Sequence, residues 1–164
     1  MRIGQSLVRE MLHEAETTRK VLGRVPDSLL GWKPHEKSST MGMLASHIAD
    51  ITGWTGPIVT MDQLEIDSDY QPWLAANQEE LMARFNWHLE EAVEHLEKQT
   101  DEHLSGTWSL IWGGQKVIEM ARVSVLRGMV CNHCYHHRGQ LSVYLRLNEI
   151  PVPAMYGPSA DEMA

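Results

Sequence analysis

Apolar side chains recur at steps of three and four residues in four stretches of the chain, and this spacing predicts four amphipathic helices. The first apolar stripe covers residues 7–22, and we expect its helix to end near Gly23 because Pro26 stands just beyond. A short helical turn follows at residues 27–30, for which Asp27 is the expected cap.

The second helix is predicted to begin at Ser39 or Thr40, since either hydroxyl can cap it, and to run to about residue 59. Pro57 lies near its end and is expected to bend or terminate it. Residues 62–72 are acidic and rich in turn formers, so this segment is predicted to be a connecting loop.

Two further helices complete the set. Asn77, followed by Glu80 three residues later, resembles a capping box and opens a helix whose buried face spans residues 81–96. The last and longest helix is expected over residues 122–147 and is stopped by Pro151.

The spacing of apolar residues changes between the third and fourth predicted helices. Residues 108–112 and 116–118 are rich in strand formers and flank Gly113-Gly114, which predicts a small β-hairpin. The resulting fold class is all-α: a four-helix bundle with this hairpin before the last helix. Two of the loops are too long for simple up-down connections, so crossover connections are expected, in a single domain spanning residues 1–164.

Composition adds constraints on function. The chain has 22 acidic and 14 basic residues, a formal net charge of −8, and no basic cluster, which argues against a protein that wraps nucleic acid. Nine histidines and six tryptophans are many for 164 residues. Histidine-rich composition can indicate metal binding, although surface histidines are an equally good explanation.

Nothing in the sequence predicts export or membrane insertion. No window approaches the roughly 18 to 20 apolar residues of a membrane span, and the N-terminal residues carry charges every few positions, unlike a signal peptide. Two cysteines, Cys131 and Cys134, are too few for a disulfide framework and fit a reducing compartment. We therefore expect a cytoplasmic protein.

His133 and His137 lie four residues apart on the last predicted helix. Positions four apart differ by about 40° around a helix axis and by one turn along it, so both imidazoles can reach one point. This H-x-x-x-H spacing suits a metal ion, but the pair alone is weak evidence.

His47 strengthens the case, because it lies in the middle of the apolar stripe of the second helix. With His47 at 0°, Trp54 falls near about −20° and Ile51 near about +40°, so the imidazole faces the core. A shared divalent ion would satisfy three buried imidazoles at once; three separate hydrogen-bonded histidines are the alternative. Three nitrogen ligands leave an open coordination position, which is the catalytic pattern.

Several stretches resemble one known family: M-L-A-S-H-I-A at residues 43–49, H-C-Y-H-H-R-G-Q-L at 133–141, I-P-V-P at 150–153 and Y-G-P at 156–158. They look like the DinB-like superfamily, which includes YfiT-like proteins and bacterial thiol-dependent transferases. The resemblance implies a four-helix bundle, frequently a homodimer, with a three-histidine divalent metal site. His47, His133 and His137 occupy the ligand positions, and the ion is most often zinc or nickel, with iron or manganese as alternatives.

Two readings of function follow. One is a divalent-metal-dependent enzyme, a hydrolase or a low-molecular-weight-thiol S-transferase, acting on a small molecule at the open position. The other is a non-catalytic metal-binding stress-response or dimeric interaction module, whose ion only holds the bundle. Neither reading includes a nucleic-acid or membrane partner.

Several residues near the three histidines are candidates for supporting roles. Asp50, one turn beyond His47, is the candidate catalytic base or imidazole partner, with a solvent-facing carboxylate as the alternative. Gln140 and Tyr144 share the metal-facing side and are candidates for supporting contacts or simple packing. The C-x-x-C of Cys131 and Cys134 lies in mid-helix, which disfavours redox chemistry, and Cys134 is a minor candidate for a fourth ligand.

Three residues adjoining His137 on the helix have their own expected roles. Arg138 is expected to pair with an acidic side chain or a substrate carboxylate. Gly139 is unfavourable inside a helix, so we expect it to allow another helix to approach closely. His136 projects about 100° away from His137 and should not bind the same ion.

Overall fold

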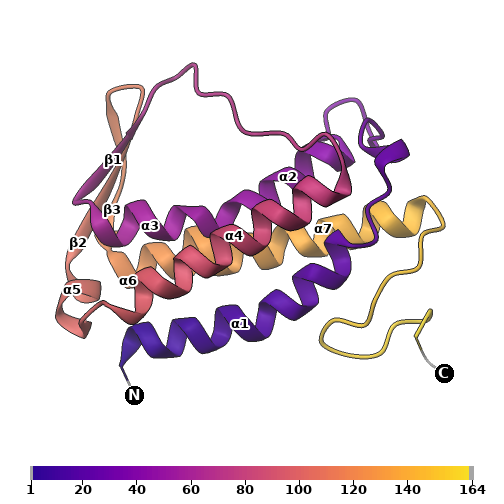
Figure 1. The fold of residues 1–164 in the computed structure, drawn as a ribbon. Helices are drawn as coiled ribbons and strands as arrows, with labels where there is room; N and C mark the ends of the chain where they lie inside the picture. Colours follow the sequence, from indigo (N-terminus) through magenta and orange to yellow (C-terminus); the bar gives the residue numbers. More distant parts are fainter. Residues whose placement is uncertain (1, 163–164) are drawn as a thin grey trace.

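The structure is a computed structural model that describes residues 2–162. Four long helices form the bundle: α1 (Ile3–Leu22), α2 (Met41–Ile51), α4 (Gln78–Glu97) and α7 (His133–Leu147). Figure 1 shows that α1 and α7 run in one direction and α2 and α4 in the other. Helix α4 packs against both α1 and α2, and α7 packs against both α2 and α1. The α1–α2 and α4–α7 connections therefore cross the bundle, as expected.

The expected apolar stripes form the core. On α4 the buried positions recur at three- and four-residue steps, as a helix that contacts two neighbours requires. The fully buried core side chains on the helices include Leu7, Ala15, Leu22, Leu44, Ile48, Leu81, Phe85, Leu96, Leu141 and Leu145. This packing holds α2 and α7 side by side.

Two of the three helix caps predicted from the sequence are confirmed, and the third is wrong. The Thr40 hydroxyl accepts a hydrogen bond from the backbone N–H of Met43 at 3.1 Å, and the Asn77 side chain accepts one from Glu80 at 2.9 Å. The cap expected at Asp27 is wrong: Asp27 lies inside a 3₁₀ turn (Asp27–Leu29) and accepts from the N–H of Gln78 at 2.7 Å. Its carboxylate therefore accepts a hydrogen bond from the first backbone N–H of α4, which has no acceptor within the helix.

The second predicted helix is divided into three pieces. Helix α2 passes into a 3₁₀ turn (Thr52–Trp54) and then into the short α3 (Thr55–Thr60). Pro57 has no backbone N–H and its ring clashes with the carbonyl four residues earlier, so a regular helix cannot continue through this point. The bend expected at Pro57 thus falls just before it.

A three-stranded sheet lies at the end of the bundle where α3 ends (Figure 1). The predicted hairpin is formed by β2 (Thr107–Trp112) and β3 (Gln115–Ala121), which turn through Gly113 and Gly114 at φ 54° and 76°. The prediction of a loop over residues 62–72 is wrong at its start, because β1 (Gln63–Ile66) pairs in parallel with β2. The short helix α5 (Asp101–Ser105) was also not predicted.

The last predicted helix is continuous but not uniform. It opens with α6 (Arg122–Val125), continues as a π-helical segment (Leu126–Asn132) and becomes regular at α7. The tail after α7 folds back on the bundle, where the Tyr156 hydroxyl donates to the Glu14 carboxylate at 2.8 Å. None of the helices within residues 2–162 is both long and apolar enough to cross a lipid bilayer.

Candidate metal centre

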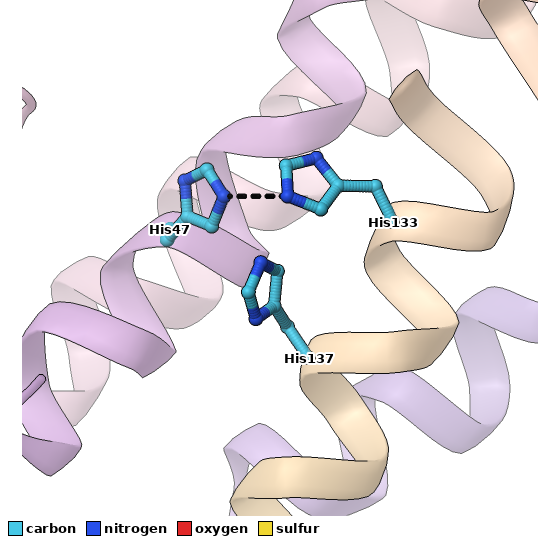
Figure 2. Close-up of side chains that lie close together, drawn as sticks. All are labelled: His47, His133 and His137. Carbon is cyan, nitrogen blue, oxygen red and sulfur yellow. Dashed lines mark hydrogen bonds between the residues drawn. The ribbon is translucent and has the colours of Figure 1, made fainter. Parts of the chain in front are cut away.

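Three imidazoles converge where α2 and α7 face each other. His47 comes from the middle of α2, His133 is the first residue of α7, and His137 follows one turn later (Figure 2). The Nε2 atoms of His47 and His133 lie 3.3 Å apart. One ring nitrogen from each of the three histidines lies within 4.8 Å of the others. The structure therefore brings the three predicted ligands together.

The separation of one pair of these nitrogens has the size that a shared ion requires. Two nitrogens bound at about 2.0–2.1 Å to a tetrahedral ion lie about 3.3–3.4 Å apart. The His47–His133 separation matches this value. The ring centroids lie 4.8 Å apart for the two pairs that include His47 and 4.5 Å apart for His133 and His137. The near-equal spacing places the rings around one point.

The outward nitrogens of two rings have acceptors. Nδ1 of His137 lies 2.7 Å from the side-chain oxygen of Gln140. Nδ1 of His133 lies 3.3 Å from the backbone oxygen of Met129. Metal-bound histidines usually donate their second N–H to such an oxygen. Both contacts leave the Nε2 atoms directed at the shared point.

The environment favours neutral imidazoles. Burial, and then repulsion by His133 and His137 whenever these are charged, lowers the pKa of His47 from 6.5 to about 4. Burial also lowers the pKa of His137, against the opposing effect of its hydrogen bond to Gln140. A neutral imidazole has a free nitrogen lone pair, so these histidines can act as ligands at neutral pH.

A cavity of about 170 Å³ adjoins the centre and is bordered by His47 and His137. Its other walls come from α2 and from the loop before α4, which is held to α2 by a 2.9 Å hydrogen bond from the Ala75 N–H to the Ser46 hydroxyl. The remaining lining residues are Ser39, Met43, Leu44, Pro72, Trp73 and Leu74. The space beside the imidazoles is therefore mostly apolar.

Asp50, the candidate base, is bound to side chains of α4. Its Oδ1 accepts hydrogen bonds from Arg84 Nε at 2.9 Å and from His88 Nε2 at 3.1 Å. Partial burial raises the pKa of the Asp50 carboxyl, but the hydrogen bonds from His88 and Arg84 outweigh it, so the pKa lies below its ordinary value of 3.8. Asp50 also borders a second cavity of about 480 Å³ beneath β1 and the following loop.

The remaining candidates, the two cysteines, Tyr144 and His136, are not part of the histidine cluster. Within residues 2–162 the three histidines form the one cluster with metal-ligand spacing, and Cys134 is outside it. Both cysteines face the core near α1, and burial raises the pKa of each thiol to about 11. Tyr144 donates from its hydroxyl to the Ser39 carbonyl at 3.3 Å. The His136 ring stands beside that of His137, with centroids 5.0 Å apart.

The ion pair expected for Arg138 is present, whereas the close helix contact expected at Gly139 is not. Arg138 is buried and forms an ion pair with Glu14 at 2.6 Å, so it pairs within the protein, as one of its two expected roles required. The close helix approach expected at Gly139 is wrong, because a Cβ there would meet nothing within 4 Å.

Sequence reasoning identified Gln140, which contacts His137, but missed the other groups around the histidines. The Met129 carbonyl carries no residue-type signal, since any residue has one. Trp73 and Leu74 reach the cavity from a loop about 26 residues beyond His47 in the chain, and no periodicity connects them to α2.

Comparisons with known proteins agree with the architecture. The chain is 29% identical over 165 residues to the uncharacterized protein YrdA of Bacillus subtilis strain 168, covering 92% of this chain and 86% of that protein. A DinB-like protein of Bacillus cereus ATCC 10987 superposes with a TM-score of 0.70 at 22% identity, over 93% of this chain and 97% of the other. A DinB-like protein of Bacillus subtilis, YjoA, gives 0.67 at 18% identity, over 97% and 99%.

The model of the DinB family matches residues 2–164, nearly the whole chain. The crossed four-helix bundle has the fold of both solved DinB-like structures. The protein therefore belongs to the DinB family.

Proposed function

We propose that this protein is a divalent-metal-dependent enzyme, a hydrolase or a low-molecular-weight-thiol S-transferase, with His47, His133 and His137 as the ligands. The observation that carries the proposal is the convergence of three imidazoles beside a cavity. Three protein ligands leave a coordination position for water or substrate, whereas structural sites are usually closed by four. A bound divalent ion would act as a Lewis acid and lower the pKa of a water or thiol.

The residues of the chain have separable roles in this proposal. The imidazoles hold the ion, and Gln140 and the Met129 carbonyl orient two of them. The apolar walls around Trp73 and Leu74 receive the body of a small substrate and keep bulk water away. Asp50 is proposed as the tentative base: its carboxylate is ionised at neutral pH, although the hydrogen bonds from His88 and Arg84 that lower its pKa also make it a weaker proton acceptor.

The ion is proposed to be zinc or nickel, because imidazole nitrogens suit both, with iron or manganese as alternatives. A small thiol is the preferred substrate type, from the family resemblance. We also propose a single cytoplasmic domain that forms a homodimer. The alternative function is a non-catalytic metal-binding module, in which the ion has no exchangeable ligand.

The test compares metal-free, zinc-loaded and nickel-loaded protein in a screen of small thiols with electrophiles and of hydrolysable esters and amides. We expect activity that requires metal, is abolished in His47→Ala and persists in His13→Ala, since His13 is an exposed histidine on α1. An activity that survives complete demetallation would contradict the proposal. Tight metal binding with a saturated coordination sphere would favour the non-catalytic module.

A further inference from the structure

The helical repeat changes immediately before His133. The segment Leu126–Asn132 is π-helical, and where it ends the N–H of His133 bonds to the carbonyl of Val130, only three residues back. In a regular α-helix that N–H would bond to the carbonyl of Met129, four residues back. The change of repeat therefore withdraws this backbone donor from Met129. Such π segments often occur at functional sites.

The side chain of His133 uses the carbonyl that its own backbone does not. Its Nδ1 lies 3.3 Å from the Met129 oxygen. A carbonyl oxygen can only accept, so the proton of this hydrogen bond belongs to Nδ1. A neutral imidazole has one N–H, so Nε2 of His133 carries the free lone pair. That lone pair faces the other two imidazoles (Figure 2).

Gln140 does for His137 what the Met129 carbonyl does for His133. Gln140 lies one turn beyond His137 on α7, and its side-chain oxygen lies 2.7 Å from Nδ1 of His137. Because this oxygen can only accept, the hydrogen bond fixes the proton on Nδ1 and leaves Nε2 as the ligand atom.

His47 differs from the other two. Its Nε2 lies 3.3 Å from Nε2 of His133, and two lone pairs at that distance would repel. Because the His133 proton is held at Nδ1, the proton between the two rings belongs to Nε2 of His47. Among the described residues, Nδ1 of His47 has no acceptor of its own.

We propose that Gln140 and the Met129 carbonyl are positioning groups that hold His137 and His133 as Nδ1–H tautomers, and that His47 alone must change tautomer when a metal binds. In that change the proton leaves Nε2 of His47 to water and another is taken up at Nδ1, so no net proton is released. The expected effect of these groups on metal affinity rests on the proposed function. The tautomers themselves can be measured in the metal-free protein.

The first experiment measures the tautomers by long-range proton–nitrogen correlation NMR on ¹⁵N-labelled, metal-free protein at neutral pH. We expect Nδ1–H for His133 and His137 and Nε2–H for His47. In Gln140→Leu, His137 should become a mixture while His133 keeps its tautomer. Finding Nε2–H at His137 in the unmodified protein, or no change in Gln140→Leu, would overturn the proposal.

The second experiment measures zinc affinity by competition with a chelator. We expect Gln140→Leu to weaken zinc binding about tenfold, as loss of such a partner typically does, and Gln140→Glu to restore it because a carboxylate is also an acceptor. The control is Ser142→Ala, whose hydroxyl donates to the Gly139 carbonyl on the same helix. Equal affinity in Gln140→Leu and the unmodified protein contradicts the positioning role.

The two proposals fail differently. If the unmodified protein takes up neither zinc nor nickel while the NMR tautomers are as expected, the proposed function falls and the assignment of positioning groups stands. If metal binds tightly but His137 does not depend on Gln140, the reverse holds. Gln140 is exposed, so its substitution does not disturb the core.

Discussion

At the scale of single residues, burial has opposite effects on the reactivity of the histidines and of the cysteines. The same loss of hydration that keeps His47 neutral, with its pKa near 4, makes it a better ligand. For a thiol the charged form is the reactive one, so burial has the opposite consequence. Cys131 and Cys134 are therefore packing residues, although their C-x-x-C spacing resembles a redox motif.

We predict that both thiols react slowly with a thiol reagent in the folded protein. Their pKa values, raised to about 11, leave almost no thiolate at neutral pH, and both side chains are buried. A stopped-flow assay with a chromogenic disulfide should show rates far below those of a free cysteine, with full reaction after denaturation. Rapid reaction of either thiol in the native state would be inconsistent with this account.

Gly139 provides a second residue-scale prediction. An added Cβ meets open space and the helix is regular there, so Gly139→Ala should remove a cost of about 0.5–1 kcal/mol in unfolding free energy. Chemical denaturation of the two proteins measures the difference. A loss of stability would mean that the position is packed against something in solution, such as a second copy of the chain.

At the scale of elements, apolar periodicity predicted every long helix, because each long helix buries a stripe on the same core. The hairpin was also predictable, since Gly113 and Gly114 adopt the positive φ angles that its turn needs. Strand β1 was not, because only Ile66 of its four residues is buried and its pairing partner lies more than 40 residues away. The π segment follows no residue pattern that periodicity analysis detects.

The link between α2 and α4 at Asp50 gives a prediction that depends on pH. Because the folded-state pKa of Asp50 lies below 3.8, its hydrogen bonds from Arg84 and His88 stabilise the protein above that pH. The contribution is lost as the pH falls through the lowered pKa. Asp50→Asn should therefore cost about 1–2 kcal/mol at neutral pH and progressively less below about pH 4.

Urea denaturation of Asp50→Asn and the unmodified protein across an acid pH series checks this sign. Glu36→Gln, an exposed carboxylate in the α1–α2 connection, serves as the control. A stability difference that grows as the solution is acidified would contradict the assignment. If metal-dependent activity is also lost at full metal occupancy, the result would support Asp50 as the base.

At the scale of the whole molecule, crossed connections bring the ligands together from distant parts of the chain. His47 and His133 are 86 residues apart, and both face the α2–α7 contact. The sequence could place each imidazole on the inner face of its own helix but not show that α2 and α7 are neighbours. The resemblance to the DinB family supplied that step, and the bundle order confirms it.

Because the ion would join two helices of the folded state, its removal should lower thermal stability. Metal at about 100 times its Kd adds about 2.7 kcal/mol to the free energy of unfolding, which corresponds to about 5–10 °C in Tm for a chain of this size. Melting curves with zinc and with a chelator should show this shift in the unmodified protein and in His13→Ala. The shift should be absent in His133→Ala; an equal shift there would place the ion elsewhere.

The central claim is that three imidazoles hold one divalent ion and leave a position open. X-ray absorption spectroscopy on the metal-loaded protein tests it most directly, because it counts ligands and identifies the ion. The account predicts three histidine nitrogens at about 2.0–2.1 Å together with at least one oxygen ligand from solvent. A spectrum showing sulfur coordination or four imidazoles, or a protein that takes up no ion under metal-replete conditions, would contradict it.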